Sequence, residues 1–266
     1  MKISKMKQAR VFLLSLVLGT LCWTNQVNAQ PAGTTNFYTA IKGYNLSVLW
    51  RADRLLLLNL NRHDPFPEPL GIIGKNNQRF YIHYTSILKD ALDPYKYKVQ
   101  GKSRVGNLVR SFSGTITITQ AGIYKAGNVY PPETYKGYKR GQLISQLVIN
   151  EDSTAPGSGS ISGKLISNFC INSKGQVFYD TLDYGEDGYS NNQFVGTWTA
   201  QRSKQSQRVQ LGDLTINDSP FSDVDGITVP PEYEKYGWQS YVNAIGNDIQ
   251  PATKAAIAEE KRQWWK

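Results

Sequence analysis

Apolar and polar residues alternate along most of this chain, in the pattern of strands that bury one of their two faces. The alternation is clearest from Gln78 to Ile87. Phe80 and Ile82 share one face there, and Tyr81 and His83 share the other. Because successive side chains of a strand point to opposite faces, this period of two predicts a half-buried strand. The same pattern predicts strands at four further segments: Tyr95–Val105, Asn107–Thr119, Gly141–Asn150 and Ser206–Ile216.

The centre of the fold is predicted between Gly157 and Ala200, where strand-like runs are separated by turn-forming residues. The first run alternates from Ile161 to Ile171, and Gly175 then suits a tight hairpin, since glycine takes a positive φ at little steric cost. The later runs are Gln176–Leu182 and Phe194–Ala200. We therefore expect a β-meander here.

Three segments have weaker patterns. The apolar run Leu55–Leu58 fits a buried strand or a helix, and a strand is favoured. From Asn61 to Glu68 the chain contains Pro65 and Pro67, which lack the backbone donor of a sheet, so a surface loop is expected. The stretch Gln120–Lys139 is long for a connection in a compact domain, and such loops often border binding sites.

The last part of the chain favours helices. Glu232–Ile245 carries apolar residues at helical spacing, and the pattern stops at Gly246. Pro251 suits the first turn of a second helix, which is expected to run through Trp265. Because Trp264 and Trp265 are too apolar to leave in water, we expect this end to pack on the β core.

The first 29 residues have the organisation of a secretory signal peptide. Basic residues precede an apolar run from Val11 to Leu21, and Val27-Asn28-Ala29 is a small-residue cleavage site. The run is shorter than the roughly 20 residues of a transmembrane helix. We predict cleavage after Ala29 and a secreted or periplasmic protein without a transmembrane segment. Cys22 suggests a lipoprotein alternative, which is disfavoured because Leu21 precedes it where a lipobox has Gly or Ala.

Together these patterns predict an all-β protein with C-terminal helices. The expected architecture is an antiparallel up-and-down β-barrel, or a strongly curved sheet, of about eight strands. Residues 1–29 are assigned to the signal peptide, residues 30–231 to the barrel domain, and residues 232–266 to a helical segment packed on the barrel.

Composition narrows the function classes without identifying one. The chain of 266 residues has 30 basic and 21 acidic residues. Removing residues 1–29 leaves 26 basic against 21 acidic, a net charge of +5 that does not indicate a nucleic-acid partner. Cys170 is then the single cysteine, so no intrachain disulfide can form. The sequence has no nucleophile elbow, P-loop, dinucleotide fingerprint or zinc-ligand series, and we predict no cofactor or metal.

The candidate ligand-binding residues are aromatic or lie on a polar strand face: Tyr81, His83, Tyr130, Tyr135 and Trp198. A histidine on such a face is either solvated or in contact with a ligand. Tyr130 and Tyr135 belong to the long connection Gln120–Lys139.

A stripe of basic residues on the predicted strand Tyr95–Val105 either solvates that strand or docks an acidic surface. It consists of Lys96, Lys98, Lys102 and Arg104.

Trp198 belongs to Gly196-Thr197-Trp198, which resembles the G-x-W strand of the calycins, the lipocalin and avidin-like barrels. This resemblance implies a similar architecture. Other segments look like a family of secreted Bacteroidetes proteins without an assigned activity, which implies a bacterial source and export across the inner membrane. They include Leu49-Trp50-Arg51-Ala52-Asp53, Glu68-Pro69-Leu70-Gly71, Asn191-Asn192-Gln193-Phe194 and Gly237-Trp238-Gln239-Ser240-Tyr241.

The expected function is non-enzymatic binding of a small molecule, a glycan or a protein surface. A hollow interior lined by aromatic side chains would favour a small ligand, and a filled interior would favour a role of the outer surface. The alternative is a secreted carbohydrate hydrolase, since the fold, and not the spacing along the chain, brings the paired carboxylates of such enzymes together.

Overall fold

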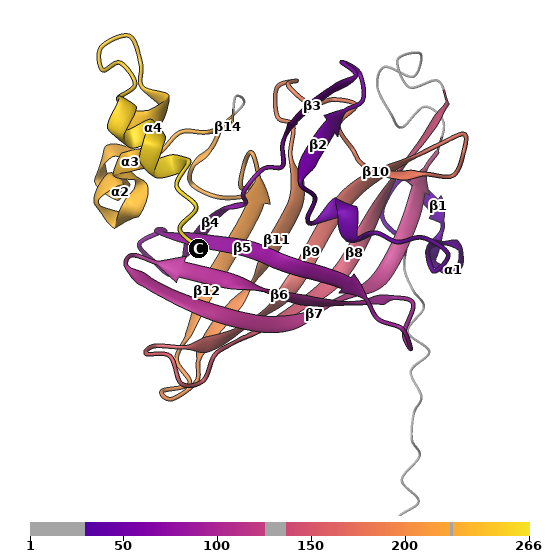
Figure 1. The fold of residues 1–266 in the computed structure, drawn as a ribbon, viewed down its shortest axis with the longest axis horizontal. Helices are drawn as coiled ribbons and strands as arrows, with labels where there is room; N and C mark the ends of the chain where they lie inside the picture. Colours follow the sequence, from indigo (N-terminus) through magenta and orange to yellow (C-terminus); the bar gives the residue numbers. More distant parts are fainter. Residues whose placement is uncertain (1–29, 126–136, 224–225) are drawn as a thin grey trace, which may run out of the picture.

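The computed structural model describes residues 30–125, 137–223 and 226–266. Strands dominate this part of the chain (Figure 1). The strands are β1 (Thr34–Asn36), β2 (Arg54–Leu57), β3 (Arg62–Pro65), β4 (Leu70–Ile73), β5 (Gln78–Lys89), β6 (Lys96–Val105), β7 (Leu108–Tyr124), β8 (Tyr138–Glu151), β9 (Gly159–Asn172), β10 (Val177–Tyr179), β11 (Asn191–Ala200), β12 (Ser206–Asp213), β13 (Ser222–Asp223) and β14 (Gly226–Ile227). The helical elements are α1 (Tyr38–Ile41), the 3-10 turn η1 (Ser47–Leu49), α2 (Pro231–Tyr233), the π-helical turn η3 (Glu234–Trp238), α3 (Gln239–Ile245) and α4 (Lys254–Glu260).

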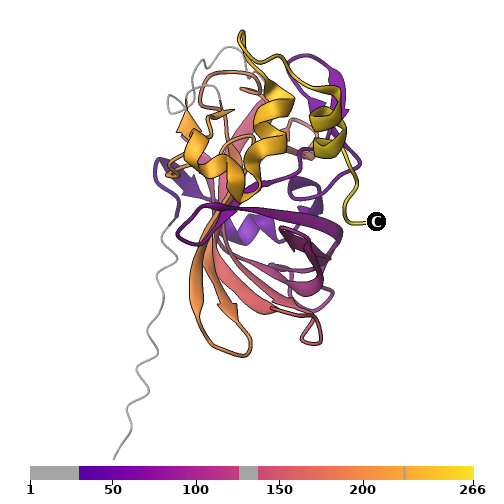
Figure 2. The ribbon, with the colours of Figure 1, turned by 90° about the vertical axis from the view of Figure 1, so that its left-hand side faces the viewer.

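Eight strands close into a ring through antiparallel pairing of neighbours. The order is β4-β5-β6-β7-β8-β9-β11-β12, and β12 pairs with β4 to complete the circle. β1 lies beside β7, and β10 lies beside β9. The predicted fold class, an antiparallel barrel or strongly curved sheet of about eight strands with C-terminal helices, is therefore confirmed (Figures 1 and 2).

Alternation along the strands sends one set of side chains into the ring. Phe80 and Ile82 of β5 are each 1% exposed, and Ile161 and Phe169 of β9 are fully buried. They belong to one contiguous apolar core that also includes residues of η1 and β2. Burying one such side chain contributes about 1.5–3 kcal/mol, so this filled interior is the main stabilising feature of the fold.

β9 and β11 approach closely where Gly163 and Gly196 face each other in register. A Cβ atom on Gly196 would lie 2.3 Å from the carbonyl oxygen of Ser162 and 2.9 Å from the Cα of Gly163. The ring of Phe194 covers the same place, with its Cζ at 2.5 Å. The glycine of the G-x-W segment is thus required by packing between two strand backbones.

Three details of the strand predictions are wrong. The central region is not a simple meander, because β11 pairs with β9 while β10 pairs with β9 over only three residues. The expected loop Asn61–Glu68 contains β3, whose hairpin with β2 places Pro65 at the strand end, where a missing N–H is tolerated. The expected connection Gln120–Lys139 begins with strand residues of β7 up to Tyr124.

The C-terminal helices are shorter than predicted. The segment Glu232–Ile245 is interrupted at Gly237, whose φ of 91° is not helical. The last helix, α4, ends at Glu260, and the residues after it form a non-helical tail. This tail packs on the sheet as expected, because the Trp265 ring stacks on the His83 ring of β5 with centroids 3.8 Å apart.

Gly196→Ala should lower the free energy of unfolding by about 2 kcal/mol or more, because the added methyl group has to displace backbone atoms. Val195→Ala changes the outward face of the same strand, where Val195 is 40% exposed, and is the matched control. It should cost less than about 1 kcal/mol. Urea unfolding of both variants checks this, and equal losses would contradict the packing argument.

Candidate functional site

A network of buried polar side chains closes one end of the ring. Asn192 lies at its centre, at the start of β11, where the pairing with β12 changes register. Its φ is 47°, a left-handed conformation that asparagine adopts more readily than most residues. Asn192 is only 8% exposed, so its amide group must find partners within the protein.

The Asn192 side chain joins several segments through hydrogen bonds. Its Nδ2 donates to the Leu49 carbonyl oxygen at 2.8 Å and to Oδ2 of Asp213 at 2.7 Å. Its Oδ1 accepts from the Ser167 hydroxyl at 2.7 Å, and that hydroxyl accepts from the Trp50 indole N–H at 2.8 Å. One amide thereby connects the end of η1 with β9, β11 and β12.

Asp213 is the residue of this network that has a free bonding position. It ends β12, is 1% exposed, and receives a second hydrogen bond at Oδ2 from the Tyr179 hydroxyl at 2.9 Å. Its other oxygen, Oδ1, is buried and has no hydrogen-bond partner in the described part of the chain. None of the ion pairs among the described residues includes Asp213. Buried polar atoms are rarely left unpaired, so this carboxyl marks a candidate site.

Burial raises the pKa of Asp213 from 3.8 to about 7, because the apolar surroundings disfavour the charged form. The negative charge of Glu68 also raises this pKa, and the hydrogen bonds from Asn192 and Tyr179 lower it. The carboxyl therefore changes its charge near neutral pH.

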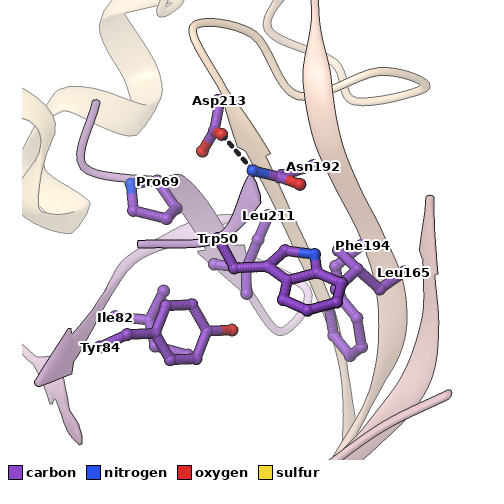
Figure 3. Close-up of a pocket in the computed structure, with 9 residues that line it drawn as sticks. All are labelled: Trp50, Pro69, Ile82, Tyr84, Leu165, Asn192, Phe194, Leu211 and Asp213. Atoms are coloured by element: carbon purple, nitrogen blue, oxygen red, sulfur yellow. Dashed lines mark hydrogen bonds between the residues drawn. The ribbon is translucent and has the colours of Figure 1, made fainter. Parts of the chain in front are cut away.

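Asp213 lines a small pocket at this end of the ring, which we call the inner pocket (Figure 3). Its volume is about 20 Å³, which is room for about one water molecule. Figure 3 shows one Asp213 oxygen bonded to Asn192 and the other on the side of Pro69. Most of the remaining lining is apolar: Trp50, Pro69, Ile82, Tyr84, Leu165, Phe194 and Leu211.

An open groove of about 800 Å³, the outer groove, adjoins the inner pocket. Three residues, Trp50, Pro69 and Tyr84, line both. The outward side chains of β5 line the groove together with the C-terminal tail. Because the two spaces share these residues, a ligand seated in the groove lies next to the pocket that holds Asp213.

Ring contacts and ion pairs hold α4 and the C-terminal tail on the sheet beside the groove. His83 stacks on Trp265, and its Nδ1 lies 2.9 Å from Oε1 of Glu68. Arg79 donates two hydrogen bonds to the Glu260 carboxylate, at 3.0 and 2.7 Å. Paired donors of this kind fix orientation as well as charge.

The predicted basic stripe is largely paired within the protein. Lys96 and Lys98 lie 3.4 and 2.9 Å from carboxylate oxygens of Asp93 and Asp90. Arg104 is 8% exposed, and its guanidinium lies 3.8 Å from the centroid of the Tyr81 ring. These pairings reduce the positive charge that the stripe offers to an acidic surface.

The structure places the predicted binding residues in separate regions. Tyr81 and His83 both line the outer groove. Trp198 lies near the opposite end of β11 from Asn192, and its indole N–H donates to Oε2 of Glu151 at 3.1 Å. Tyr130 and Tyr135 lie outside the described residues.

Glu151 is a second buried carboxylate, and its environment contrasts with that of Asp213. Its Oε1 accepts from the Ser103 hydroxyl at 2.5 Å, and its Oε2 accepts from the Gly159 backbone N–H at 2.8 Å. The Arg110 Nε lies 4.0 Å from Oε2. Both oxygens are bonded and a cation is near, so this residue has a structural role.

Sequence reasoning missed Asp213 and Asn192. Val209, Leu211 and Asp213 are alternate residues of β12, and all three are buried. A charged residue in a series of inward positions could have marked Asp213 as a candidate site residue. Nothing in the residues around Asn192 marks the register shift that brings its side chain to Asp213.

The fold and site define an antiparallel ring of strands with a polar network, a small pocket and a groove at one end. Comparisons with models of protein families, with curated proteins and with solved structures find no match to this chain. Across the described residues, no helix has the length and apolar character to cross a bilayer. In the same residues, no cluster of three or more His, Cys, Asp or Glu side chains is arranged to hold a metal ion.

Asp213→Asn tests the charge state of the site through the pH dependence of stability. Native Asp213 keeps its proton up to about pH 7, whereas the unfolded chain loses it near 3.9. The native state therefore binds more protons in between, and the contribution of Asp213 to stability falls as pH rises through that range.

The variant cannot titrate at this position, so its stability relative to the wild type should increase from about pH 4 to 7 and level off above, by up to about 4 kcal/mol. Urea unfolding of both proteins across this range measures the difference. A difference that does not change with pH would show that Asp213 is not held protonated.

Proposed function

We propose that this protein is a secreted binding protein that acts without catalysing a reaction. Its ligand, a small molecule, a glycan or part of a protein surface, would sit at the end of the ring where Trp50, Pro69 and Tyr84 lie. The observation that carries this proposal is that the groove and the pocket share these residues. The inner pocket has mostly apolar walls with a few convergent polar groups, which is typical of binding sites. The outer groove adds charged side chains to this lining.

The filled interior favours a ligand that sits at the rim of the ring. Apolar core side chains pack inside, and the inner pocket has a volume of only about 20 Å³. The outer groove, at about 800 Å³, falls in the range of roughly 300–1,000 Å³ that small-molecule sites occupy. The bulk of a ligand is therefore expected in the groove, and only a small group would reach Asp213.

Export of the protein is part of the same proposal. It is supported by the basic start, apolar run and small-residue cleavage site within residues 1–29. The resemblance to secreted Bacteroidetes proteins agrees with export across the inner membrane, and the resemblance to the calycins implies a similar architecture.

A second candidate function, hydrolysis of a carbohydrate, is favoured by one observation. Two carboxyl groups, those of Asp213 and Glu68, are near enough for the charge of Glu68 to raise the pKa of Asp213. A carboxylic acid that holds its proton near neutral pH is suited to general acid catalysis. Binding remains the better supported function, because a sugar ring does not fit beside Asp213 in the inner pocket.

Blocking the groove tests the proposed function. Ala52 lines the outer groove, and Ala52→Trp should fill part of it. We expect ligands found by screening small molecules, oligosaccharides and peptides against the wild-type protein to bind this variant at least tenfold more weakly. Calorimetric titration measures the affinities.

Val195→Trp is the matched control, because it introduces the same side chain on the outward face of β11, away from the groove. Ligands that bind both variants equally well would contradict a site in the groove. Release of reducing sugar from oligosaccharides by the wild type, lost in Asp213→Asn, would favour the hydrolase instead.

A further inference from the structure

We propose that the inner pocket binds a primary ammonium group, which donates a hydrogen bond to Oδ1 of Asp213 while the rest of the ligand lies in the outer groove. The inference rests on the proposed binding function and adds the chemical class of the ligand. Its starting point is the one oxygen of the buried network that lacks a partner among the described residues.

Charge is the first argument for a cation. An ionised carboxylate buried without a counter-charge is strongly disfavoured, and a cation beside it removes most of this cost. Glu151, at the other end of the ring, has Arg110 as such a neighbour at 4.0 Å. Asp213 takes part in none of the ion pairs found in the described ranges. A cation from the ligand would supply the positive counter-charge to Asp213 that the described part of the chain lacks.

Size is the second argument, and it selects among organic cations. The inner pocket has room for about one water-sized group. The –NH3⁺ head of a primary amine is of that size, whereas a guanidinium or a trimethylammonium group is larger. A primary amine also carries the N–H donor that Oδ1 requires.

The lining of the pocket suits the carbon chain next to such a head. Trp50 and Tyr84 present aromatic rings at the junction of pocket and groove (Figure 3). Aromatic faces attract cations and pack against methylene groups. A metal ion would instead require several oxygen ligands, and Asn192 Oδ1 already accepts the Ser167 hydroxyl.

The ionisable groups around Asp213 do not provide the missing charge. They are neutral or negative: Tyr84, Tyr179, Tyr184, Tyr189 and Glu68. Since the pKa of Asp213 is raised to about 7, the carboxyl ionises as pH rises past neutrality. Binding of an ammonium group should therefore strengthen between about pH 5.5 and 8, below the range in which alkylamines lose their own charge.

The test compares three probes by calorimetric titration of the whole protein: n-butylammonium, n-butanol and tetramethylammonium. At pH 8 we expect the wild type to bind n-butylammonium at least tenfold more tightly than either of the other two. Asp213→Asn should remove this preference, and Asp187→Asn, which removes one exposed acidic charge, should keep it. Lowering the pH to 5.5 should weaken n-butylammonium binding to the wild type about thirtyfold, in proportion to the ionised fraction of Asp213.

The outcomes separate this inference from the proposed function. Equal binding of n-butylammonium and n-butanol, both lost in Ala52→Trp, would overturn the ammonium inference and leave the groove as a binding site. Binding of neither would overturn the inference, and the ligand screen with Ala52→Trp then decides on the proposed function separately. Should Asp213→Asn fail to fold, the probe comparison and the pH series in the wild type still decide.

Discussion

The Asn192 amide is the contact on which one end of the ring depends. Hydrogen bonding between neighbouring strands closes the ring around its circumference. The apolar core inside still has to be covered at the two open ends. Asn192 does this at one end by bonding Leu49, Ser167 and Asp213 from different segments. Loss of this side chain would remove a hydrogen bond from each of the three groups, although Ser167 would keep Trp50 and Asp213 would keep Tyr179 as a partner. A buried polar group that is left unpaired costs about 1–3 kcal/mol.

The two ends of the ring use buried carboxylates in different ways. Both oxygens of Glu151 are bonded, and Arg110 lies close by, so that end is complete within the protein. One carboxylate oxygen of Asp213 accepts hydrogen bonds from the network, and the other has no hydrogen-bond partner among the described residues and lies beside the inner pocket. The contrast matters for the site because the outer groove adjoins the Asp213 end of the ring.

The sheet could be predicted from the sequence because a strand that buries one face has to alternate. β5, β6 and the long central strand β9 follow this rule closely, and their ranges were predicted to within a few residues. β3 was predicted as a loop because it contains Pro65, although a proline is tolerated at the end of an edge strand. Glycine at position 237 broke a helix that apolar spacing alone would have continued.

The site was harder to predict than the fold because its residues meet only through tertiary structure. Asp213 could have been suspected as a charged residue in the inward series of β12. Tyr179 reaches it from β10, and Trp50, the residue after η1, lines the same pocket. No local sequence pattern indicates that these residues meet. The groove depends on where the C-terminal tail returns to β5, which periodicity does not describe.

The most direct test of this account is a titration of the Asp213 side-chain carbon by ¹³C nuclear magnetic resonance. A buried carboxyl with one unbonded oxygen and no counter-charge should titrate with a midpoint of about 7. A midpoint near 3.9, the value of an aspartate in water, would contradict the account, because it would mean that solvent or a cation already stabilises the ionised carboxylate.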